Sequence, residues 1–289
     1  MRLIKFIIAS AISSLPFFTI AQQKKEEIKL IVRADDIGFC HAANEGIIKS
    51  YRDGIARSAE IIVPSPWFLE AVKMLNENPG LDVGIHLCLT SEWNNIKWRP
   101  VTHASSLADS NGYFYPFLWP NDLFPKNAGN FLLENNPKLD EVEKEFRAQL
   151  SLAKKHVKNL THISAHMGCS DIKPEVKELV KKLAVEYGLL FEAPKIIQFK
   201  NFAGKEKNEK QKEEELVNIL KSLTPGTYMI VSHPCLDTEE TKTIGHPNYL
   251  ERGTDRAGET YALTSERVKS VIKEKKIKLV SVKEGYLNP

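Results

Sequence analysis

Apolar runs alternate with amphipathic segments along most of this chain. The apolar runs are typical of strands buried on both faces and span 28–34, 58–63, 81–89, 161–165, 189–192, 228–232 and 278–282. Segments with apolar residues every three or four positions predict helices over 43–51, 67–76, 139–157, 174–187, 213–222 and 264–274. Strands separated by helices predict an α/β fold with a parallel sheet and right-handed crossovers. The length favours a closed or partly closed TIM-like barrel over a dinucleotide-binding sheet.

One interval, 90–138, interrupts this rhythm. It shows no clear element yet is rich in aromatic residues, among them Trp93, Trp98, Tyr113, Phe114, Tyr115, Phe117, Trp119 and Phe124. So many aromatic residues argue against disorder, and a long loop after a barrel strand lies over the active-site face. We expect most of these rings to form a small core of the loop. Trp93 and Trp98 lie nearest the strand end and are predicted to contact a substrate sugar.

The first 21 residues are typical of a secretory signal. Arg2 and Lys5 precede the apolar run 6–20, and small residues stand at the expected cleavage positions. The run is short for a membrane span and is interrupted by polar residues and a proline. We therefore expect residues 1–21 to be removed, leaving 22–289 as a single periplasmic or secreted barrel domain with no membrane attachment.

Charge, motif and cysteine content bear on the kind of ligand that the protein binds and on the state of its thiols. The net charge is +3, with lysines spread among glutamates, which gives no argument for a nucleic-acid partner. The first strand is not followed by Gly-x-Gly-x-x-Gly, the main dinucleotide signal. Disulfides are permitted in an exported chain, in three complete pairings, but we expect buried thiols near strand ends at Cys40, Cys88, Cys169 and Cys235. The sequence leaves monomer and homodimer open.

Chemically active side chains lie where several predicted strands end. These are Asp35 and Asp36 after the first strand, His86 late in the third, and His166 and His233 after two later strands. Asp-Asp-x-Gly by itself also suits a turn. In a parallel α/β fold, however, the strand carboxyl ends open on one face. Asp36, His86 and His166 would there form a metal site of two imidazoles and one carboxylate.

His162 precedes His166 by four residues on the same predicted strand. It would lie deeper in the sheet, and we expect it to be a buried, hydrogen-bonded residue that supports the site.

Five motifs, in this order, resemble those of the YdjC-like carbohydrate deacetylases, a group that includes chitooligosaccharide deacetylases. They are Ala34-Asp35-Asp36-x-Gly38 with Asn44-x-Gly46-Ile47, Val83-Gly84-Ile85-His86-Leu87, Thr161-His162-x-x-x-His166-Met167-Gly168, His233-Pro234 and Arg256-x-x-Glu259. The resemblance covers nearly all of the chain after the signal. It implies a distorted (β/α) barrel, one divalent metal ion and hydrolysis of the N-acetyl group of an amino sugar.

Carried over by position, the resemblance assigns the metal to the three predicted ligands. It makes Asp35 the general base and His233 the general acid or electrophile, and we assign Arg256 to substrate binding. Two imidazoles and one carboxylate suit Zn²⁺, while Mg²⁺ prefers oxygen ligands. The family is often assigned Mg²⁺, so both metals remain open.

The chain departs from the family pattern at two places. Ser164-Ala165 stand where the family usually has Asp-Ser, and Cys235 stands where it often has glycine. The first departure either removes a carboxylate behind the metal ligands or alters substrate contacts.

Two other functions are alternatives. A glycoside hydrolase would use two carboxylates on opposite sides of the scissile bond, for which the adjacent Asp35 and Asp36 are poorly placed. A non-catalytic, exported carbohydrate-binding protein would have no need of a metal site.

Overall fold

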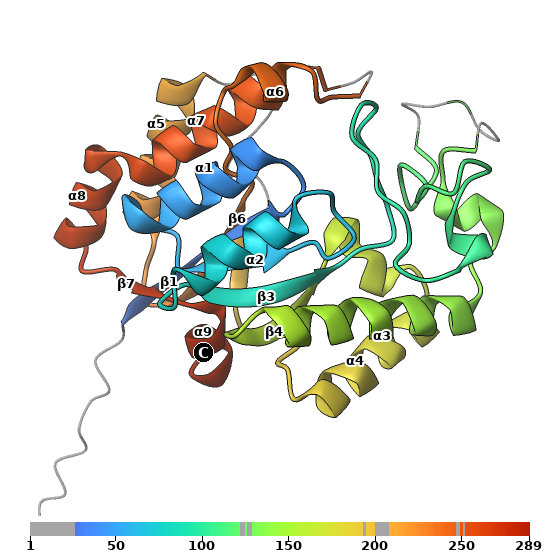
Figure 1. Cartoon of the computed structure of the whole chain (residues 1–289). Helices are drawn as coiled ribbons and strands as arrows, with labels where there is room; N and C mark the ends of the chain where they lie inside the picture. Colours follow the sequence, from blue (N-terminus) through green and yellow to red (C-terminus); the bar gives the residue numbers. More distant parts are fainter. Residues whose placement is uncertain are drawn as a thin grey trace, which may run out of the picture.

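A single parallel sheet forms the centre of the molecule (Figure 1). The computed structural model describes residues 27–121, 125, 129–192, 195–199, 208–246, 249–250 and 252–289, so the predicted signal lies outside the described residues. The sheet contains β1 (Ile28–Ile37), β2 (Ser58–Ile61), β3 (Asp82–Leu87), β4 (Leu160–Ala165), β5 (Ile197–Phe199), β6 (Gly226–Ser232) and β7 (Lys278–Val280). Every pair of neighbouring strands is parallel, which confirms the predicted α/β class.

Helices surround the sheet, with α1, α2 and α7 along one side and α3 and α4 near β3 and β4 (Figure 1). The helices are α1 (His41–Arg52), α2 (Phe68–Asn76), α3 (Leu139–His156), α4 (Pro174–Tyr187), α5 (Glu209–Ser222), α6 (Glu239–Lys242), α7 (Arg252–Thr264), α8 (Glu266–Glu274) and α9 (Val282–Leu287). The helix predicted over 264–274 is confirmed as α8. The side chain of Ser265 caps this helix by accepting hydrogen bonds from Arg267 N and Val268 N.

The strand order is β4-β3-β2-β1-β6-β5, with β7 beside the first half of β1. The strand predicted over 189–192 is wrong, because only Leu190 forms a bridge there, with His162 of β4. From Leu190 the chain continues to β5, which pairs with β6 at the other end of the order. Among the described residues no strand ladder joins β4 to β5, so closure of the sheet into a TIM-like barrel stays a prediction.

The register of the strands brings the candidate residues to one end of the sheet. Ala34 pairs with Ala59 and Ile37 with Ile61, and the irregularity between them holds Asp35 and Asp36. His86 pairs with Ser164 across β3 and β4. Candidate side chains from β1, β3 and β4 therefore meet at the carboxyl end of the sheet, where parallel folds bind their ligands.

The aromatic loop after β3 packs largely on itself and on the barrel, as predicted. Phe114 and Phe131 are fully buried, whereas Trp119 is 42 % exposed; Phe124 lies outside the described residues.

All four cysteines are buried free thiols, which confirms the expectation from sequence. In the part of the chain that the structure describes, no helix is both long and apolar enough to cross a membrane.

Candidate active site

Asp36 occupies an uncommon backbone conformation at the end of β1. Its φ is 74°, in the left-handed region that most residues avoid and that aspartate tolerates better than most. The turn is held by Asn44, whose Oδ1 accepts a hydrogen bond of 2.7 Å from Gly38 N. Strained backbone conformations occur frequently at functional sites.

Asp36, His86 and His166 form one buried group. One side-chain ligand atom from each lies within 4.8 Å of the others. Asp36 Oδ1 is 3.2 Å from His166 Nδ1 and 3.6 Å from His86 Nε2, yet it has no hydrogen-bond partner of acceptable geometry among the described residues. A buried carboxylate oxygen in this position needs a partner, and a cation bound by both imidazoles would provide one. The three side chains therefore fit a divalent metal ion.

The pKa shifts of Asp36 and His86 give both groups the protonation states that metal ligands require. Burial by itself raises the pKa of the Asp36 carboxyl, but neighbouring positive groups, His166 first, outweigh it and hold the pKa well below its usual range. Burial lowers the pKa of His86 to about 4, so this ring is neutral near pH 7. Metal ligands must be ionised carboxylates and neutral imidazoles, and both groups meet that condition.

His166 lies between two carboxylates. Its Nδ1 faces Asp36, and its Nε2 is 3.1 Å from Glu92 Oε2. Burial lowers the pKa of His166, but the negative charges around it, Glu92 first, raise it well above its usual value. Glu92 would orient this ring with Nδ1 toward a metal. The sequence analysis missed Glu92, because a single glutamate inside a loop carries no periodic signal.

Asp35 lies beside the centre and is fixed by Arg33. The guanidinium donates two hydrogen bonds, each 2.7 Å, to the two oxygens of Asp35, and Asp35 Oδ2 is 3.7 Å from His86 Nε2. Such a two-point pair holds a carboxylate in one orientation. Arg33 is a second functional candidate that the sequence analysis did not identify.

His233 is at the end of β6, as predicted, and is half-buried. Its backbone N–H donates a hydrogen bond of 2.6 Å to Glu259 Oε2, which also accepts one of 2.6 Å from Ser232 Oγ. Glu259 thus anchors the strand end that carries the histidine. His233 is among the groups that lower the pKa of Asp36 after burial has raised it.

The three predicted substrate-binding residues have protein contacts in this structure. Trp93 and Trp98 are each only 2 % exposed. The Trp93 ring stacks on His246, with centroids 5.7 Å apart, and lies 5.2 Å from the Arg256 guanidinium carbon. Arg256 itself donates a hydrogen bond of 3.1 Å to Asp36 Oδ2. Their contact with a sugar stays a prediction, while the contact between Arg256 and Asp36 is a role that the sequence did not indicate.

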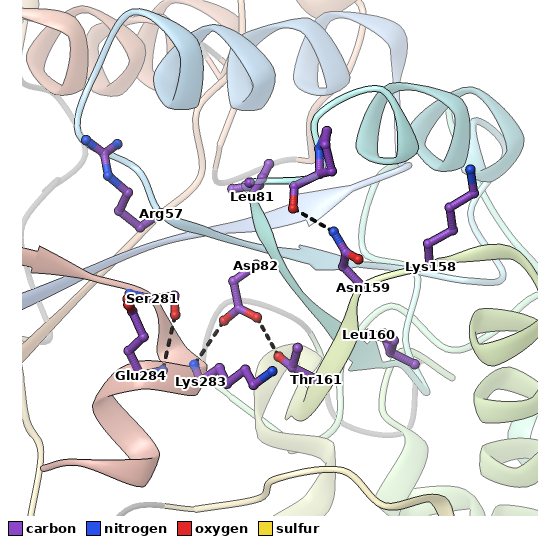
Figure 2. A pocket seen from close by; sticks show the side chains of 12 residues that line it. Arg57, Leu81, Asp82, Lys158, Asn159, Leu160, Thr161, Ser281, Lys283 and Glu284 are labelled. Atoms are coloured by element: carbon purple, nitrogen blue, oxygen red, sulfur yellow. Dashed lines mark hydrogen bonds between the residues drawn. The ribbon is translucent and has the colours of Figure 1, made fainter.

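A separate cavity of about 610 Å³ opens at the opposite end of the strands (Figure 2). Among its lining residues is Asp82, the first residue of β3. Its carboxylate accepts hydrogen bonds from Ser58 Oγ at 3.1 Å, Thr161 Oγ1 at 2.6 Å and Lys283 N at 3.0 Å. This carboxylate therefore joins the starts of two strands to α9, whereas the predicted metal ligands lie at the other end of the sheet.

The chain is similar to known proteins over most of its length. The model of the YdjC-like protein family matches residues 29–274, and the chain belongs to this family. It is 29% identical over 277 residues to a carbohydrate deacetylase of Brevibacillus brevis, covering 89% of this chain and 99% of that protein. It is also 29% identical over 266 residues to carbohydrate deacetylase 2 of Listeria innocua, covering 88% and 97%.

A solved structure shares the fold. It is that of a protein of Enterococcus faecalis V583 described as a "putative cellobiose-phosphate cleavage protein", with a TM-score of 0.69 and 24% identity. The match covers 88% of this chain and 97% of that one. The two proteins thus share this α/β fold.

Proposed function

We propose that this protein is a metal-dependent hydrolase that removes the N-acetyl group from an amino sugar or its oligosaccharide. The observation that carries the proposal is the buried group of Asp36, His86 and His166, with a carboxylate oxygen left unbonded between two imidazoles. The names of its relatives supply the reaction class, since curated proteins that align with most of this chain are carbohydrate deacetylases.

Asp36, His86 and His166 are the residues that would hold the ion. A divalent ion there supplies polarisation of the acetyl carbonyl and a lowered pKa for water. Two imidazoles and one carboxylate suit Zn²⁺ or another transition ion better than Mg²⁺, which prefers oxygen. Zn²⁺ is therefore our first candidate and Mg²⁺ the alternative.

The reaction breaks the amide C–N bond, consumes one water and yields acetate and a free amine. Asp35 accepts the proton of the attacking water as general base, and the two hydrogen bonds from Arg33 hold its carboxylate in place. His233 donates a proton to the leaving nitrogen or stabilises the developing oxyanion. Arg256 occupies Asp36 Oδ2, which leaves Oδ1 toward the two imidazoles.

The decisive experiment measures acetate release from N-acetylglucosamine oligomers, with and without a chelator and after reloading with Zn²⁺ or Mg²⁺. We expect release that the chelator abolishes and one metal restores, together with that metal in elemental analysis of protein purified without added metal. Release that resists the chelator contradicts the proposal. New reducing ends without acetate would indicate a glycoside hydrolase, and sugar binding without turnover would indicate a binding protein.

We also propose that the protein acts in the periplasm or outside the cell after losing residues 1–21. The support is the signal-like pattern of the first residues. Amino-terminal sequencing of the protein recovered from each cellular fraction tests it, and a full-length chain retained in the cytoplasm contradicts it.

A further inference from the structure

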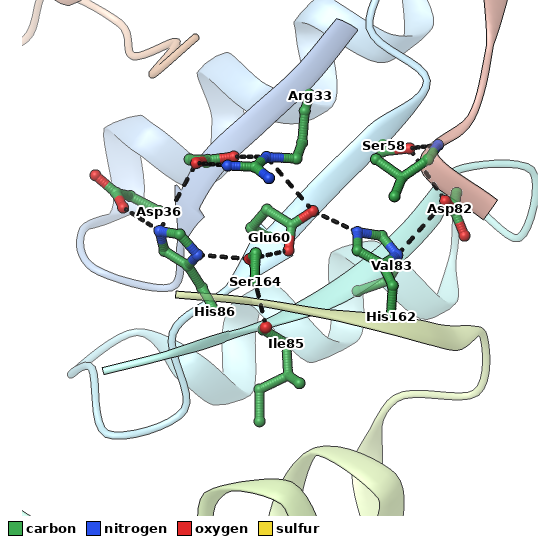
Figure 3. Close-up of polar contacts among 12 residues, drawn as sticks. Arg33, Asp36, Ser58, Glu60, Asp82, Val83, Ile85, His86, His162 and Ser164 are labelled. Atoms are coloured by element: carbon green, nitrogen blue, oxygen red, sulfur yellow. Dashed lines mark hydrogen bonds and ion pairs between the residues drawn. The ribbon is translucent and has the colours of Figure 1, made fainter. Parts of the chain in front are cut away.

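Glu60 is a fully buried carboxylate at the centre of the sheet, on β2 (Figure 3). A buried charge is costly unless it is paired and hydrogen-bonded. Its Oε1 is 2.5 Å from His162 Nε2, and Arg33 Nε lies 3.8 Å from the same oxygen. Its Oε2 accepts the hydrogen bond of the Ser164 hydroxyl. Neither the proposed reaction nor the predicted ligand set uses this residue.

Ser164 connects Glu60 to a predicted metal ligand. Ser164 and His86 are paired neighbours on β4 and β3, and the serine Oγ is 2.6 Å from His86 Nδ1 (Figure 3). Three side chains from three adjacent strands thus form one hydrogen-bonded row, which runs from His86 through Ser164 to Glu60.

The number of protons in this row determines the tautomer of His86. An ionised carboxylate can only accept hydrogen bonds, and a serine hydroxyl has a single hydrogen to donate. Because Ser164 gives that hydrogen to Glu60, its oxygen must accept from His86. His86 therefore carries its proton on Nδ1, and the lone pair is on Nε2, the nitrogen that lies 3.6 Å from Asp36 Oδ1.

Glu60 remains an anion in this setting. Burial by itself raises the pKa of its carboxyl, but its interactions with His162 and with the Arg33 guanidinium outweigh that effect and lower the pKa to about 2. The carboxylate therefore accepts the hydrogen bond of Ser164 near neutral pH.

We propose that Glu60, acting through Ser164, is a positioning residue that holds His86 in the tautomer able to bind a cation through Nε2. Where the family usually has an aspartate, this chain has Ser164 on β4, and the carboxylate comes instead from Glu60 on β2, on the other side of β3. The row also raises the basicity of the ligand, as partners behind a metal-bound imidazole generally do. The cation-binding part of this inference rests on the proposed function; the tautomer part does not.

The first experiment uses the metal-free protein. Long-range ¹H–¹⁵N correlation spectra report which ring nitrogen of a histidine carries the proton. We expect the Nδ1–H form for His86 in the wild type, loss of that preference in Ser164→Ala, and its return in Ser164→Thr, which keeps a hydroxyl. Ser58→Ala is the matched control, because it removes another buried hydroxyl that donates to a carboxylate, Asp82, at 3.1 Å.

The second experiment measures affinity for Zn²⁺ and Co²⁺ by competition with a chromophoric chelator. We expect Ser164→Ala to bind about 10–100-fold more weakly and Ser58→Ala to bind like the wild type. Glu60→Gln should weaken binding as well, since Ser164 and His162 contact different oxygens of Glu60 and glutamine replaces one of them with an NH₂ donor; thermal unfolding establishes whether this variant folds.

The two proposals fail in different ways. A wild type in which His86 lacks the Nδ1–H preference, or a Ser164→Ala protein with unchanged tautomer and unchanged affinity, overturns the inference about Glu60. A wild type that binds neither Zn²⁺ nor Co²⁺ overturns the proposed function, while the tautomer spectra still decide whether Glu60 positions His86.

Discussion

Arg256 donates a hydrogen bond of 3.1 Å to Oδ2 of Asp36, although 220 residues separate the two in the sequence. Both side chains are buried. Burial by itself lowers the pKa of Arg256, but the negative charge of Asp36 outweighs it and raises the pKa above its usual value. The pair joins α7 to the end of β1 and leaves the second oxygen of Asp36 free to bind a cation.

Arg256→Met should therefore destabilise the metal-free protein by about 3–5 kcal/mol, because it leaves Asp36 buried without its cation. Urea unfolding measures this loss, and added metal should recover part of it. The control is Arg147→Met, which removes a half-exposed guanidinium paired with Glu143 and Glu186 and should cost at most about 1 kcal/mol. Equal losses in the two variants contradict the buried-pair interpretation.

Asp35→Asn should reduce kcat about 10²–10⁴-fold, because an amide cannot accept the proton of the attacking water. Its affinity for metal should change little, since Asp35 is not among the three predicted ligands. Acetate release and chelator competition measure the two effects separately. Asp53→Asn, at an exposed position, is the control. An unimpaired Asp35→Asn would remove Asp35 from the mechanism.

Glu92→Gln tests the support of the other histidine ligand. The amide can still accept a hydrogen bond from His166 Nε2, but it lacks the charge that raises the basicity of the ring, so we expect affinity for Zn²⁺ to fall about tenfold. Glu45→Gln, on the exposed side of α1, should have no effect. Unchanged affinity in Glu92→Gln would limit Glu92 to a structural role.

The four cysteines provide a test of the covalent structure. All are buried and free, and burial raises the pKa of Cys88 and Cys169. A thiol reagent should therefore label almost none of them in the native protein and all four after unfolding without reductant. Fewer than four reactive thiols after unfolding would reveal a disulfide in the purified protein.

The stability contributed by His41 should depend on pH. The hydrogen bond of its Nδ1 to Glu70 Oε1, at 2.8 Å, raises the pKa of His41 above its usual value. A raised pKa in the folded protein means that stabilisation is complete below about pH 6.5, the unfolded value, and disappears as pH rises through the folded value. The wild type should therefore have a higher free energy of unfolding than His41→Gln at low pH, and this difference should decrease as pH rises.

Because His41 is 42 % exposed, we expect this advantage to be below about 1 kcal/mol. Thermal unfolding across the pH range measures it. In a Glu70→Gln background the pH dependence of the difference should become much weaker; a difference that grows with pH would contradict the assigned partner.

The sequence by itself was sufficient for the class of fold and for the composition of the candidate metal site. Continuous apolar runs separated by amphipathic segments specify a parallel sheet, and parallel strands bring their carboxyl ends to one edge. That rule alone placed Asp36, His86 and His166 together. One short element escaped it: β5 has only three residues, two of them exposed, which is too few for a recognisable pattern.

Only the tertiary structure determines which other side chains support those predicted ligands through hydrogen bonds and ion pairs. Whether Glu60 meets Ser164, whether Glu92 reaches His166 and whether Arg256 pairs with Asp36 depend on strand register and loop packing, which no local pattern encodes. The same holds for Trp93, whose ring is buried against protein. Periodicity reports which face of an element is buried. It does not report which charged groups, distant in sequence, must pair because both are excluded from water.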